Sequence, residues 1–455
     1  MKAAEITLLG GILRGVERMD IKGVSIDSRT IREGELFVAI KGVRFDGHDF
    51  VPEAINRGAW GAVVERSSLE NRYPSLSGLR NIIPVEDTLL SLQEMSGMHR
   101  KKYSIPVVGI TGSNGKTTTK EMLACILRQK GQVLKNEGNL NNHIGVPLTL
   151  MKLGEHHRFA AIEMGMSGPG EIEMLARLAM PDVGVITNIG PAHLEFLGST
   201  DMIAQAKGEL LEEMKPEGTA VLNADDPYFE TLKKRFSGRI VTFGIDGPAD
   251  ITAEDIRLEK DTSDFTLRAQ GKTIPMRLHA VGTYNVYNAL AAAAAALAVA
   301  IPLESVKSGL EEFSPFSMRS EIKNIGGRVI FEDCYNANPQ SMAAALEALV
   351  SIRAGRMNIA VLGDMMELGD TGPEAHRTIG RRVAQLGIDL LVTVGPLAKL
   401  IGDGAIEAGM SEERVVAARS NAEAAALLRT RTQPGDAILI KGSRAMKMEK
   451  ILEDF

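Results

Sequence analysis

The chain has 455 residues, which is enough for about three domains, and a formal net charge of −6. Its hydrophobic fraction of 44% and charged fraction of 24% are ordinary for a globular protein and exclude a disordered or fibrous chain. The acidic balance and the lack of a long basic run argue against a nucleic-acid partner, and the two cysteines, Cys125 and Cys334, are too few for a disulfide framework or a zinc site.

The sequence contains neither a secretory signal nor a segment that could cross a membrane. The apolar patch at residues 6–9 is flanked by Glu5 and Arg14, which is not the form of a signal peptide. The most apolar run, residues 289–301, is shorter than the roughly 20 residues that a bilayer requires. We therefore expect a cytoplasmic protein that does not insert into membranes.

Residues 1–103 are predicted to form a small mixed α/β domain. A helix is expected at 48–57 and another at 88–102, before Pro106, where we place the domain boundary. The polar segments 27–30 and 42–48 by themselves indicate solvated turns rather than a site. The expected strands are 23–26, 36–40 and 61–64.

Residues 104–315 alternate strands and helices, which predicts a doubly wound parallel sheet. Residues 251–281 alternate apolar and polar positions over short runs and should add antiparallel hairpins. Helices are expected at 201–214 and, because alanine has the highest helix propensity, at 285–300. The expected parallel strands are 107–110, 159–164, 183–187, 220–222 and 240–243.

The segment VVGITGSNGKTTTK, residues 107–120, predicts a phosphate-binding loop between a strand and a helix. Glycines allow backbone N–H groups to surround phosphate oxygens, Lys116 can reach the terminal phosphates, and Thr117 offers a hydroxyl to Mg²⁺. The loop departs from the common G-x-x-x-x-G-K-[ST] spacing, because Ile110 stands at the position of the first glycine. The ligand that this loop suits is a nucleoside triphosphate.

Polar residues follow the other strands of this sheet, at the edge where ligands gather. Glu163 ends the second strand and can hold Mg²⁺. His193 lies in the loop after the third strand, where a lone histidine is more often plain surface, and Lys207 by itself indicates a solvated helix lysine. Near the start of the alanine-rich helix, Asn285 and Asn288 are the candidates for ligand contact.

Residues 316–455 predict a second, Rossmann-like sheet without a dinucleotide fingerprint. Polar residues at 333–339, 363–364 and 441–444 follow its strands and should surround a second crevice. The expected strands are 328–332, 358–362, 390–394, 414–417 and 437–441.

Six motifs of this chain together resemble the Mur ligases, the ATP-dependent amide-forming enzymes of peptidoglycan precursor synthesis. Within that family, two of the motifs resemble the branch that adds D-alanyl-D-alanine to a UDP-N-acetylmuramoyl-tripeptide: YNANPQSM at 335–342 and LGDMMELG at 362–369. The others are ITGSNGKTTTK at 110–120, NLNNHIGVPLTL at 139–150, EMGMSGPGEI at 163–172 and TNIGPAHLEFLGS at 187–199.

The resemblance implies that ATP phosphorylates the carboxylate of the UDP-linked tripeptide and that the amine of D-alanyl-D-alanine then attacks the acyl phosphate. It implies ATP, two Mg²⁺ sites and a CO₂-derived carbamate on Lys207 as cofactors, with Lys116, Lys207, His193 and Glu163 as catalytic residues. It also implies three domains: 1–103 for the UDP-sugar substrate, 104–315 for ATP, and 316–455 closing on ATP and the dipeptide, in a chain expected to act as a monomer.

The residue roles implied by the resemblance fall into four groups. The ATP-binding residues are Gly112, Ser113, Asn114, Gly115, Lys116, Thr117, Thr118, Asn288, Arg319 and Asp333. The metal ligands are Thr117, Glu163, His193 and carbamylated Lys207. The UDP-substrate residues are Ser28, Arg29, Phe45, Asp46, Gly47 and His48, and Asn336, Asn338 and Asp364 lie on the dipeptide side.

Two positions depart from the family pattern. Tyr284 precedes Asn285 where relatives often have histidine, which leaves the adenine-stacking partner open, and His143 stands where an acid is common. Two alternatives to this function are another ligase of the superfamily, such as the diaminopimelate- or lysine-adding enzyme or a folylpolyglutamate synthetase, and a nucleotide-gated regulatory protein with no transfer chemistry. Whether the tripeptide ends in meso-diaminopimelate or lysine stays open.

Overall fold

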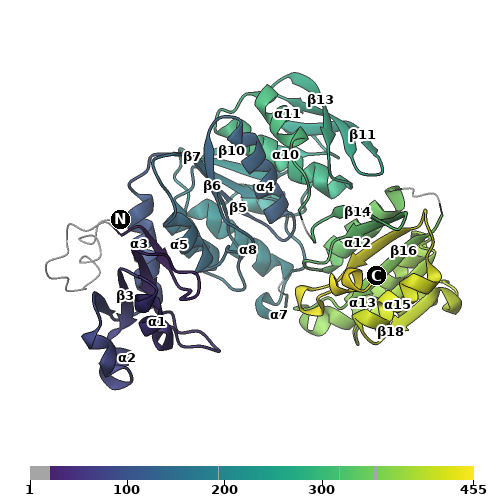
Figure 1. Cartoon of the computed structure of the whole chain (residues 1–455). Coiled ribbons are helices and arrows are strands. Elements are labelled where there is room, and N and C mark those ends of the chain that lie inside the picture. The colour runs from purple at the N-terminus through teal and green to yellow at the C-terminus, as the bar shows by residue number, and fades with distance from the viewer. Residues whose placement is uncertain (1–20, 193, 317, 353–355) are drawn as a thin grey trace. The chain divides into compact units, whose positions relative to one another are not determined.

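A computed structural model describes residues 21–192, 194–316, 318–352 and 356–455 (Figure 1). The chain divides into two compact units. The first consists of the described part of Met1–Gly109 together with Gly131–Met166 and Glu171–Pro181; the second consists of the described parts of Ile110–Lys130, Ser167–Gly170 and Asp182–Phe455. His193, one of the predicted metal ligands, lies outside the described residues, as does the segment 6–9.

The first unit contains a four-stranded parallel sheet in the order β1-β2-β3-β4. Successive residues of β2 face opposite sides, so that Leu36 and Val38 pack in one core cluster and Phe37 packs in another. The strands are β1 (Gly23–Ser25), β2 (Glu35–Val38), β3 (Gly61–Glu65) and β4 (Ile82–Val85), and the helices are η3 (Gly47–Phe50), α1 (Val51–Asn56), α2 (Arg66–Asn71), η4 (Pro74–Gly78) and α3 (Thr88–Arg100).

The prediction of strands near β1, β2 and β3 is confirmed, whereas β4 and α2 were not predicted. β4 has only four residues and contains Pro84, and a proline inside a short apolar run argues against a strand. The unit continues with β6 (Gln132–Lys135), α5 (Gly145–Leu150), β7 (His157–Glu163) and α6 (Glu171–Ala179), and β6 pairs with β7 in parallel.

A nine-stranded sheet has the order β13-β12-β11-β10-β9-β8-β5-β7-β6. Strands β8, β9, β10 and β11 pair in parallel, and β11, β12 and β13 form an antiparallel meander. The predicted parallel sheet with added antiparallel strands is therefore confirmed. The remaining strands are β5 (Val107–Thr111), β8 (Val183–Ile186), β9 (Thr219–Asn223), β10 (Arg239–Gly244), β11 (Ile251–Leu258), β12 (Ser263–Ala269) and β13 (Lys272–Leu278).

Helices of the second unit accompany this sheet. α10 packs against α4 and also contacts β10 and β11. Its run of alanines is entirely buried, as expected for close helix packing. The helices are α4 (Lys116–Arg128), α7 (Leu194–Leu197), α8 (Thr200–Glu212), α9 (Phe229–Lys233), α10 (Thr283–Ala298) and α11 (Leu303–Glu311).

A separate six-stranded sheet has the order β14-β15-β19-β16-β17-β18, with two core clusters of buried apolar residues around it. β14 runs antiparallel to β15, and the other neighbours are parallel. All five predicted strands are present; β14 was not predicted. The strands are β14 (Glu321–Ile325), β15 (Arg328–Glu332), β16 (Asn358–Gly363), β17 (Leu390–Val394), β18 (Val415–Ala418) and β19 (Ala437–Lys441).

The helices of this third region are α12 (Pro339–Ser351), η5 (Gly369–Thr371), α13 (Gly372–Gln385), α14 (Lys399–Glu407), η6 (Glu412–Arg414), α15 (Asn421–Arg431), η7 (Arg444–Met446) and α16 (Lys450–Glu453).

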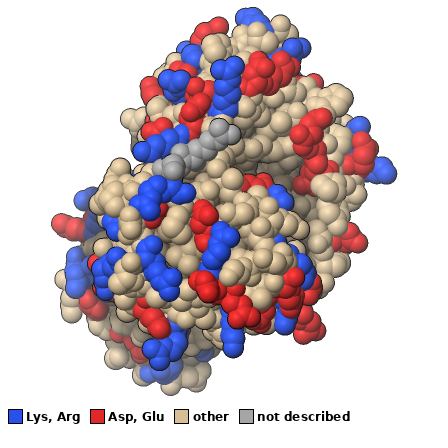
Figure 2. Space-filling model, turned by 90° about the vertical axis from the view of Figure 1, so that its right-hand side faces the viewer, with Lys and Arg blue, Asp and Glu red and all other residues tan. Residues whose placement is uncertain are grey.

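On the face drawn in Figure 2, acidic and basic side chains are interspersed. A search of the described residues finds no helix with the length and apolarity needed to span a membrane.

Candidate active site

The glycine-rich loop joins β5 to α4, as predicted, and two of its glycines are required by close contacts. Gly112 has φ +146°, and a Cβ built there would lie 1.9 Å from Oγ1 of Thr187. Gly115, the N-cap of α4, has φ +79°, and its Cβ would lie 2.0 Å from Oδ1 of Asn288. No larger side chain fits either position without displacing these neighbours. The start of α4 consequently presents backbone N–H groups of the kind that bind phosphate.

A second segment, residues 187–190 at the end of β8, fixes the shape of the loop. The backbone N–H of Ser113 donates to the carbonyl of Asn188 at 2.9 Å, and the N–H of Asn114 donates to Oδ1 of Asn188 at 3.0 Å. The hydroxyl of Thr187 donates to the carbonyl of Asn114 at 2.6 Å, and the hydroxyl of Ser113 bonds both the N–H and the carbonyl of Gly190 at 2.9 Å. The loop therefore holds its shape through contacts within the protein.

Lys116 and Thr117, both predicted to bind ATP, are the first two residues of α4. Lys116 donates from Nζ to the carbonyl of Gly112 at 2.7 Å and to that of Ser113 at 3.3 Å. Thr117 is buried. Both residues thus lie where the helix begins, next to the loop that shapes the expected phosphate site.

Lys207 is buried in α8, a helix whose N-cap Ser199 accepts a hydrogen bond from Met202. Burial lowers the pKa of its amine well below the usual lysine value, and the charge of Lys116 lowers it further. Within the described part of the chain, no carboxylate pairs with Lys207. The alternative of a solvated helix lysine is therefore wrong, and the amine is held in an environment that favours its neutral form.

Glu163 lies at the carboxyl end of β7 in the first unit, and its side chain is buried. Asn141 donates to its Oε1 at 2.7 Å. The side chain of Asn136 holds the backbone of Glu163 on both sides, accepting from its N–H at 2.7 Å and donating to its carbonyl at 3.2 Å. Its role as a metal ligand stays a prediction, as does that of His193, which the structure does not describe.

Asn288, predicted to contact adenine, lies against the first turn of α4. Its Oδ1 accepts from the hydroxyl of Thr119 at 3.4 Å, and its Nδ2 donates to Oδ1 of Asn285 at 3.2 Å. Asn285 in turn donates to the carbonyl of Val281 at 2.9 Å. The amide of Asn288 therefore supports the loop at Gly115, and its contact with adenine stays a prediction.

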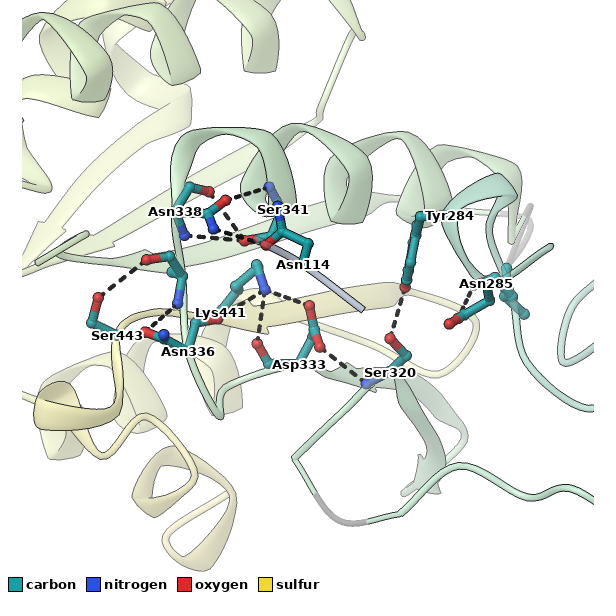
Figure 3. Close-up of polar contacts among 12 residues, drawn as sticks. Asn114, Tyr284, Asn285, Ser320, Asp333, Asn336, Asn338, Ser341, Lys441 and Ser443 are labelled. Carbon is teal, nitrogen blue, oxygen red and sulfur yellow. Dashed lines mark hydrogen bonds and ion pairs between the residues drawn. The ribbon is translucent and has the colours of Figure 1, made fainter. Parts of the chain in front are cut away.

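Tyr284 joins the start of α10 to the segment before β14. Its hydroxyl lies 2.8 Å from Oγ of Ser320 (Figure 3). Burial raises the pKa of the Tyr284 phenol well above its usual value, and the charge of Asp333 raises it further, so the group stays protonated. Its role as the adenine-stacking partner stays open.

At the carboxyl ends of β15 and β19, the buried Lys441 forms an ion pair with the partly buried Asp333, with Nζ and Oδ2 2.5 Å apart (Figure 3). Lys441 also donates to the carbonyl of Asn336 at 3.0 Å, and the N–H of Ser320 donates to Oδ1 of Asp333 at 3.1 Å. The guanidinium of Arg319, adjacent to Ser320, lies 3.8 Å from the centre of the Tyr335 ring. The structure thus brings together Arg319, Asp333 and Asn336, three of the residues predicted for ATP and the dipeptide.

Asn338 caps the N-terminus of α12 and also reaches the phosphate loop. Its Oδ1 accepts from the N–H of Ser341 at 2.9 Å, and its Nδ2 donates to Oδ1 of Asn114 at 2.8 Å (Figure 3). Gln340, which was not predicted as a site residue, accepts from Nδ2 of Asn114 at 2.9 Å. Both ends of the Asn338 amide are therefore engaged within the protein.

Asp364, predicted on the dipeptide side, is buried at the end of β16. Its Oδ1 accepts from the N–H of Ala398 at 2.6 Å, and its backbone carbonyl accepts from the N–H of Ser443 at 3.0 Å. A cavity of about 430 Å³ begins at the next residue, and it is lined by residues 365–370 together with Gly372, Pro373, Leu397 and Glu195.

The residues predicted to hold the UDP-linked substrate divide into a buried frame and an exposed pair. Asp46 accepts from the N–H of His48 at 3.1 Å and from its Nδ1 at 2.6 Å, and Nε2 of His48 accepts from the N–H of Glu65 at 2.8 Å. Burial alone would raise the pKa of Asp46, but the bonds to His48 lower it below its usual value. The side chain of Arg29 is 80% exposed and pairs with Asp27 at 2.7 Å.

The other three members of this group complete the pattern. Phe45 is 71% exposed, whereas the hydroxyl of Ser28 is buried and donates to Glu53 at 3.1 Å. A Cβ on Gly47 would lie 2.6 Å from the backbone nitrogen of Ile40, so a glycine is required there. The hydrogen bonds of Asp46 and His48 fix the conformation of the segment 46–48. The exposed side chains of Arg29 and Phe45 remain accessible to a ligand.

Sequence reasoning missed several residues that shape the site. Thr187 and Asn188 were noted only as part of a motif, and Lys441 only as part of a strand end. Thr187 and Asn188 follow β8 and Lys441 is the last residue of β19, so a position at the end of a strand is the one signal that could have selected them. Gln340 carries no such signal, because its contact depends on where α12 meets the loop.

Three family models match consecutive parts of the chain. Residues 20–100 match the model described as "Mur ligase family, catalytic domain", residues 110–296 match "Mur ligase middle domain", and residues 318–444 match "Mur ligase, glutamate ligase domain". The domain boundaries that we predicted near residues 103 and 315 stay predictions.

Similar proteins and structures extend over the whole chain. The UDP-N-acetylmuramoyl-tripeptide–D-alanyl-D-alanine ligase of Bacillus subtilis is 37% identical, covering 96% of this chain and 94% of its own length, and that of Escherichia coli is 35% identical, covering 98% and 96%. A crystal structure of MurF from Acinetobacter baumannii has a TM-score of 0.89 and 33% identity, covering 100% of this chain and 98% of the other. MurF of Thermotoga maritima in complex with ADP has a TM-score of 0.84 and 30% identity, covering 96% and 97%.

These similarities confirm the resemblance drawn from the six motifs, and the full-length structural match confirms the predicted fold class. The chain belongs to the Mur ligase family.

Proposed function

We propose that this chain is an ATP-dependent ligase that joins D-alanyl-D-alanine to a UDP-N-acetylmuramoyl-tripeptide through an acyl phosphate, in peptidoglycan precursor synthesis. Its full-length relatives from Bacillus subtilis and Escherichia coli bear the name of that activity. The observation that carries the proposal is the juxtaposition of a rigid phosphate loop with a buried lysine, Lys207, whose pKa is lowered by burial and by Lys116. A protein that only binds nucleotide needs no such lysine.

The first step activates a carboxylate, which is otherwise a poor acylating agent because its leaving group is poor. The carboxylate oxygen forms a bond to the γ-phosphorus, and the bond from that phosphorus to the bridging oxygen breaks, releasing ADP. The phosphate loop holds the phosphates through backbone N–H groups at the start of α4. Lys116 is close enough to exchange the carbonyls of Gly112 and Ser113 for phosphate oxygens, whose charge it then neutralises.

The hydroxyl of Thr117 and the carboxylate of Glu163 are oxygen donors of the kind that suits magnesium. Mg²⁺ prefers oxygen ligands and usually takes several of them from substrate phosphates. The described residues contain no group of three or more His, Cys, Asp or Glu side chains that could hold a metal ion. We propose that one ion is held by Thr117, Glu163 and phosphate oxygens, and a second by His193 and modified Lys207, as the resemblance implies. When bound, the ions supply positive charge where charge develops on the phosphoryl oxygens.

The environment of Lys207 suits the modification that the second site requires. A neutral amine attacks CO₂, forming an N–C bond and releasing one proton to solvent, whereas an ammonium cannot. Burial and the nearby Lys116 both lower the pKa of Lys207 and so favour the reactive form. The product is a carbamate, an anionic oxygen donor in place of a cation.

In the second step, the amine of D-alanyl-D-alanine attacks the acyl carbon and phosphate leaves. We assign the dipeptide to the side formed by Asn336, Asn338 and Asp364. The cavity of about 430 Å³ next to Asp364 has room for a dipeptide, and Met365 and Leu397 provide apolar surface there for methyl groups. Because the side-chain amide, the backbone N–H and the carbonyl of Asn338 are all engaged within the protein, we assign this residue to shaping the dipeptide side.

Phosphate release from ATP tests this proposal when each substrate is omitted in turn. We expect release to require both the UDP-linked tripeptide and D-alanyl-D-alanine, and mass spectrometry to show the amide product. Tripeptides ending in meso-diaminopimelate and in lysine should be compared, because the sequence leaves this residue open. Release that continues at the same rate without the dipeptide would show that the activity is different.

A further inference from the structure

The side chain of Asn114, in the phosphate loop, is held by two residues from the start of α12. Its Oδ1 accepts from Nδ2 of Asn338 at 2.8 Å (Figure 3). Its Nδ2 donates to Oε1 of Gln340 at 2.9 Å. The donor and the acceptor of one amide are thus both engaged, by residues more than 220 positions away in the sequence. We refer to Asn114, Asn338 and Gln340 as the amide clamp.

Each side of the amide clamp is fixed by its own element. The backbone of Asn114 is held by the hydroxyl of Thr187 and the side chain of Asn188, so its position follows the shape of the phosphate loop. Asn338 forms a capping box with Ser341, so its position follows α12. Hydrogen bonds between two rigid elements transmit a displacement of one to the other.

Gln340 also touches the segment that shapes the loop. A Cβ built on Gly190 would lie 2.1 Å from Oε1 of Gln340, and the N–H and carbonyl of Gly190 both bond the hydroxyl of Ser113. Gln340 therefore lies against both segments of the phosphate site. An alanine at position 190 would displace the flexible end of Gln340 and leave the side chain of Asn114 in place.

The loop directly before α12 carries Asp333 and Asn336, which Lys441 holds together. Because this loop leads directly into the clamp residues, the position of Asp333 and Asn336 depends on the clamp. We propose that Asn338 and Gln340 are positioning residues that place this loop against the phosphate loop, so that a triphosphate in the loop orders the groups expected to hold ribose and dipeptide. The role in dipeptide binding rests on the proposed function; the mechanical link does not.

Hydrogen exchange of peptides covering residues 333–342 tests the link without any turnover. The probe is inorganic tripolyphosphate with Mg²⁺, which has no ribose and so cannot contact Asp333 as a nucleoside would. In the wild type, we expect the probe to slow exchange in this segment by about fivefold, the effect of roughly one hydrogen bond. In Gln340→Leu and in Gly190→Ala the slowing should be lost, and in Gln385→Leu, the same substitution on α13, it should remain.

A double-mutant cycle provides the kinetic test. Asn114→Ala and Gln340→Leu should each lower kcat/KM for the dipeptide about fivefold, and the double variant should be no worse than the more affected single variant. Effects that multiply, or exchange of 333–342 that ignores the probe in the wild type, would overturn the proposal. A wild-type chain that forms no amide would refute the proposed function alone, since the exchange experiment still decides the link.

Discussion

Two lysines buried to the same degree have opposite surroundings. Lys207 in α8 and Lys441 at the end of β19 are each 2% exposed. Lys441 donates to Oδ2 of Asp333 at 2.5 Å and to the carbonyl of Asn336 at 3.0 Å. Lys207 has no carboxylate partner among the described residues, and the charge that affects it is the like charge of Lys116.

The difference shows that burial alone does not define the role of a lysine. An isolated buried ammonium is so costly that the group loses its proton, whereas a buried ammonium with a carboxylate and a carbonyl keeps its charge and fixes their positions. Lys441 therefore acts as a structural cation that organises the loop before α12. Burial without a carboxylate lowers the pKa of Lys207, which favours its amine form and suits chemistry rather than structure.

The largest effect should follow removal of the Lys207 amine. Lys207→Met keeps an unbranched apolar chain of similar size but cannot form a carbamate, so charge on the phosphoryl oxygens loses one means of stabilisation. We expect kcat for phosphate release to fall by about a hundredfold to a thousandfold, the cost of losing one group that stabilises a transition state. The measurement is the coupled phosphate assay with both substrates present.

The matched control is Lys215→Met, the same substitution at an exposed lysine just after α8, which should leave kcat within about twofold of the wild type. If Lys207→Met retained wild-type turnover, the claim that the amine of Lys207 takes part in the reaction would be wrong.

Removal of the charge at position 441 should instead reduce stability. Lys441→Met leaves the carboxylate of Asp333 largely buried without its cation, and breaking a buried pair in this way costs about 3 kcal/mol. The expected result is a lower urea midpoint for unfolding of the six-stranded sheet, followed by a fluorescent label on an exposed position of α15.

Removing both charges should restore much of this loss. In Asp333→Asn combined with Lys441→Met, the asparagine oxygen can still accept from the N–H of Ser320, and no uncompensated charge remains. A double variant as unstable as the sum of the two single variants would show that the pair is not coupled.

The sequence predicted the fold well where strands are buried on both faces. β15, β17 and β19 were predicted to the residue because each contains a run of at least three apolar residues, typical of a central parallel strand. The strands that were not predicted lie at sheet edges, namely β4, β6 and β14, where short mixed sequences look like loops.

The site was predicted to the extent that its chemistry is local. The phosphate loop is one continuous segment with a characteristic order of glycine, lysine and threonine, so its position at the start of α4 was predictable. The burial of Lys207 was not, because it depends on packing between segments distant in the sequence. For the same reason, the pairing of Lys441 with Asp333 and the contact of Gln340 with Asn114 could not be read from either motif.

The smallest effect, and the most direct measure of the contrast, is the pH dependence of stability at Lys207. In the folded chain the pKa of Lys207 is lowered from its usual value of 10.5. At a pH between the lowered pKa and 10.5, the unfolded chain therefore binds more protons than the folded one. Stability of the wild type should therefore rise with pH across this window, and Lys207→Met should remove that contribution. At neutral pH the variant should melt a few degrees higher than the wild type.

This advantage should shrink as the pH approaches 10.5, because the unfolded lysine then also becomes neutral. Differential scanning calorimetry of both chains over this range gives the difference directly, and Lys215→Met should show none. A difference that stayed constant with pH would mean that Lys207 keeps its charge when folded, and that the cost of burying this charge without a carboxylate is offset by something other than deprotonation.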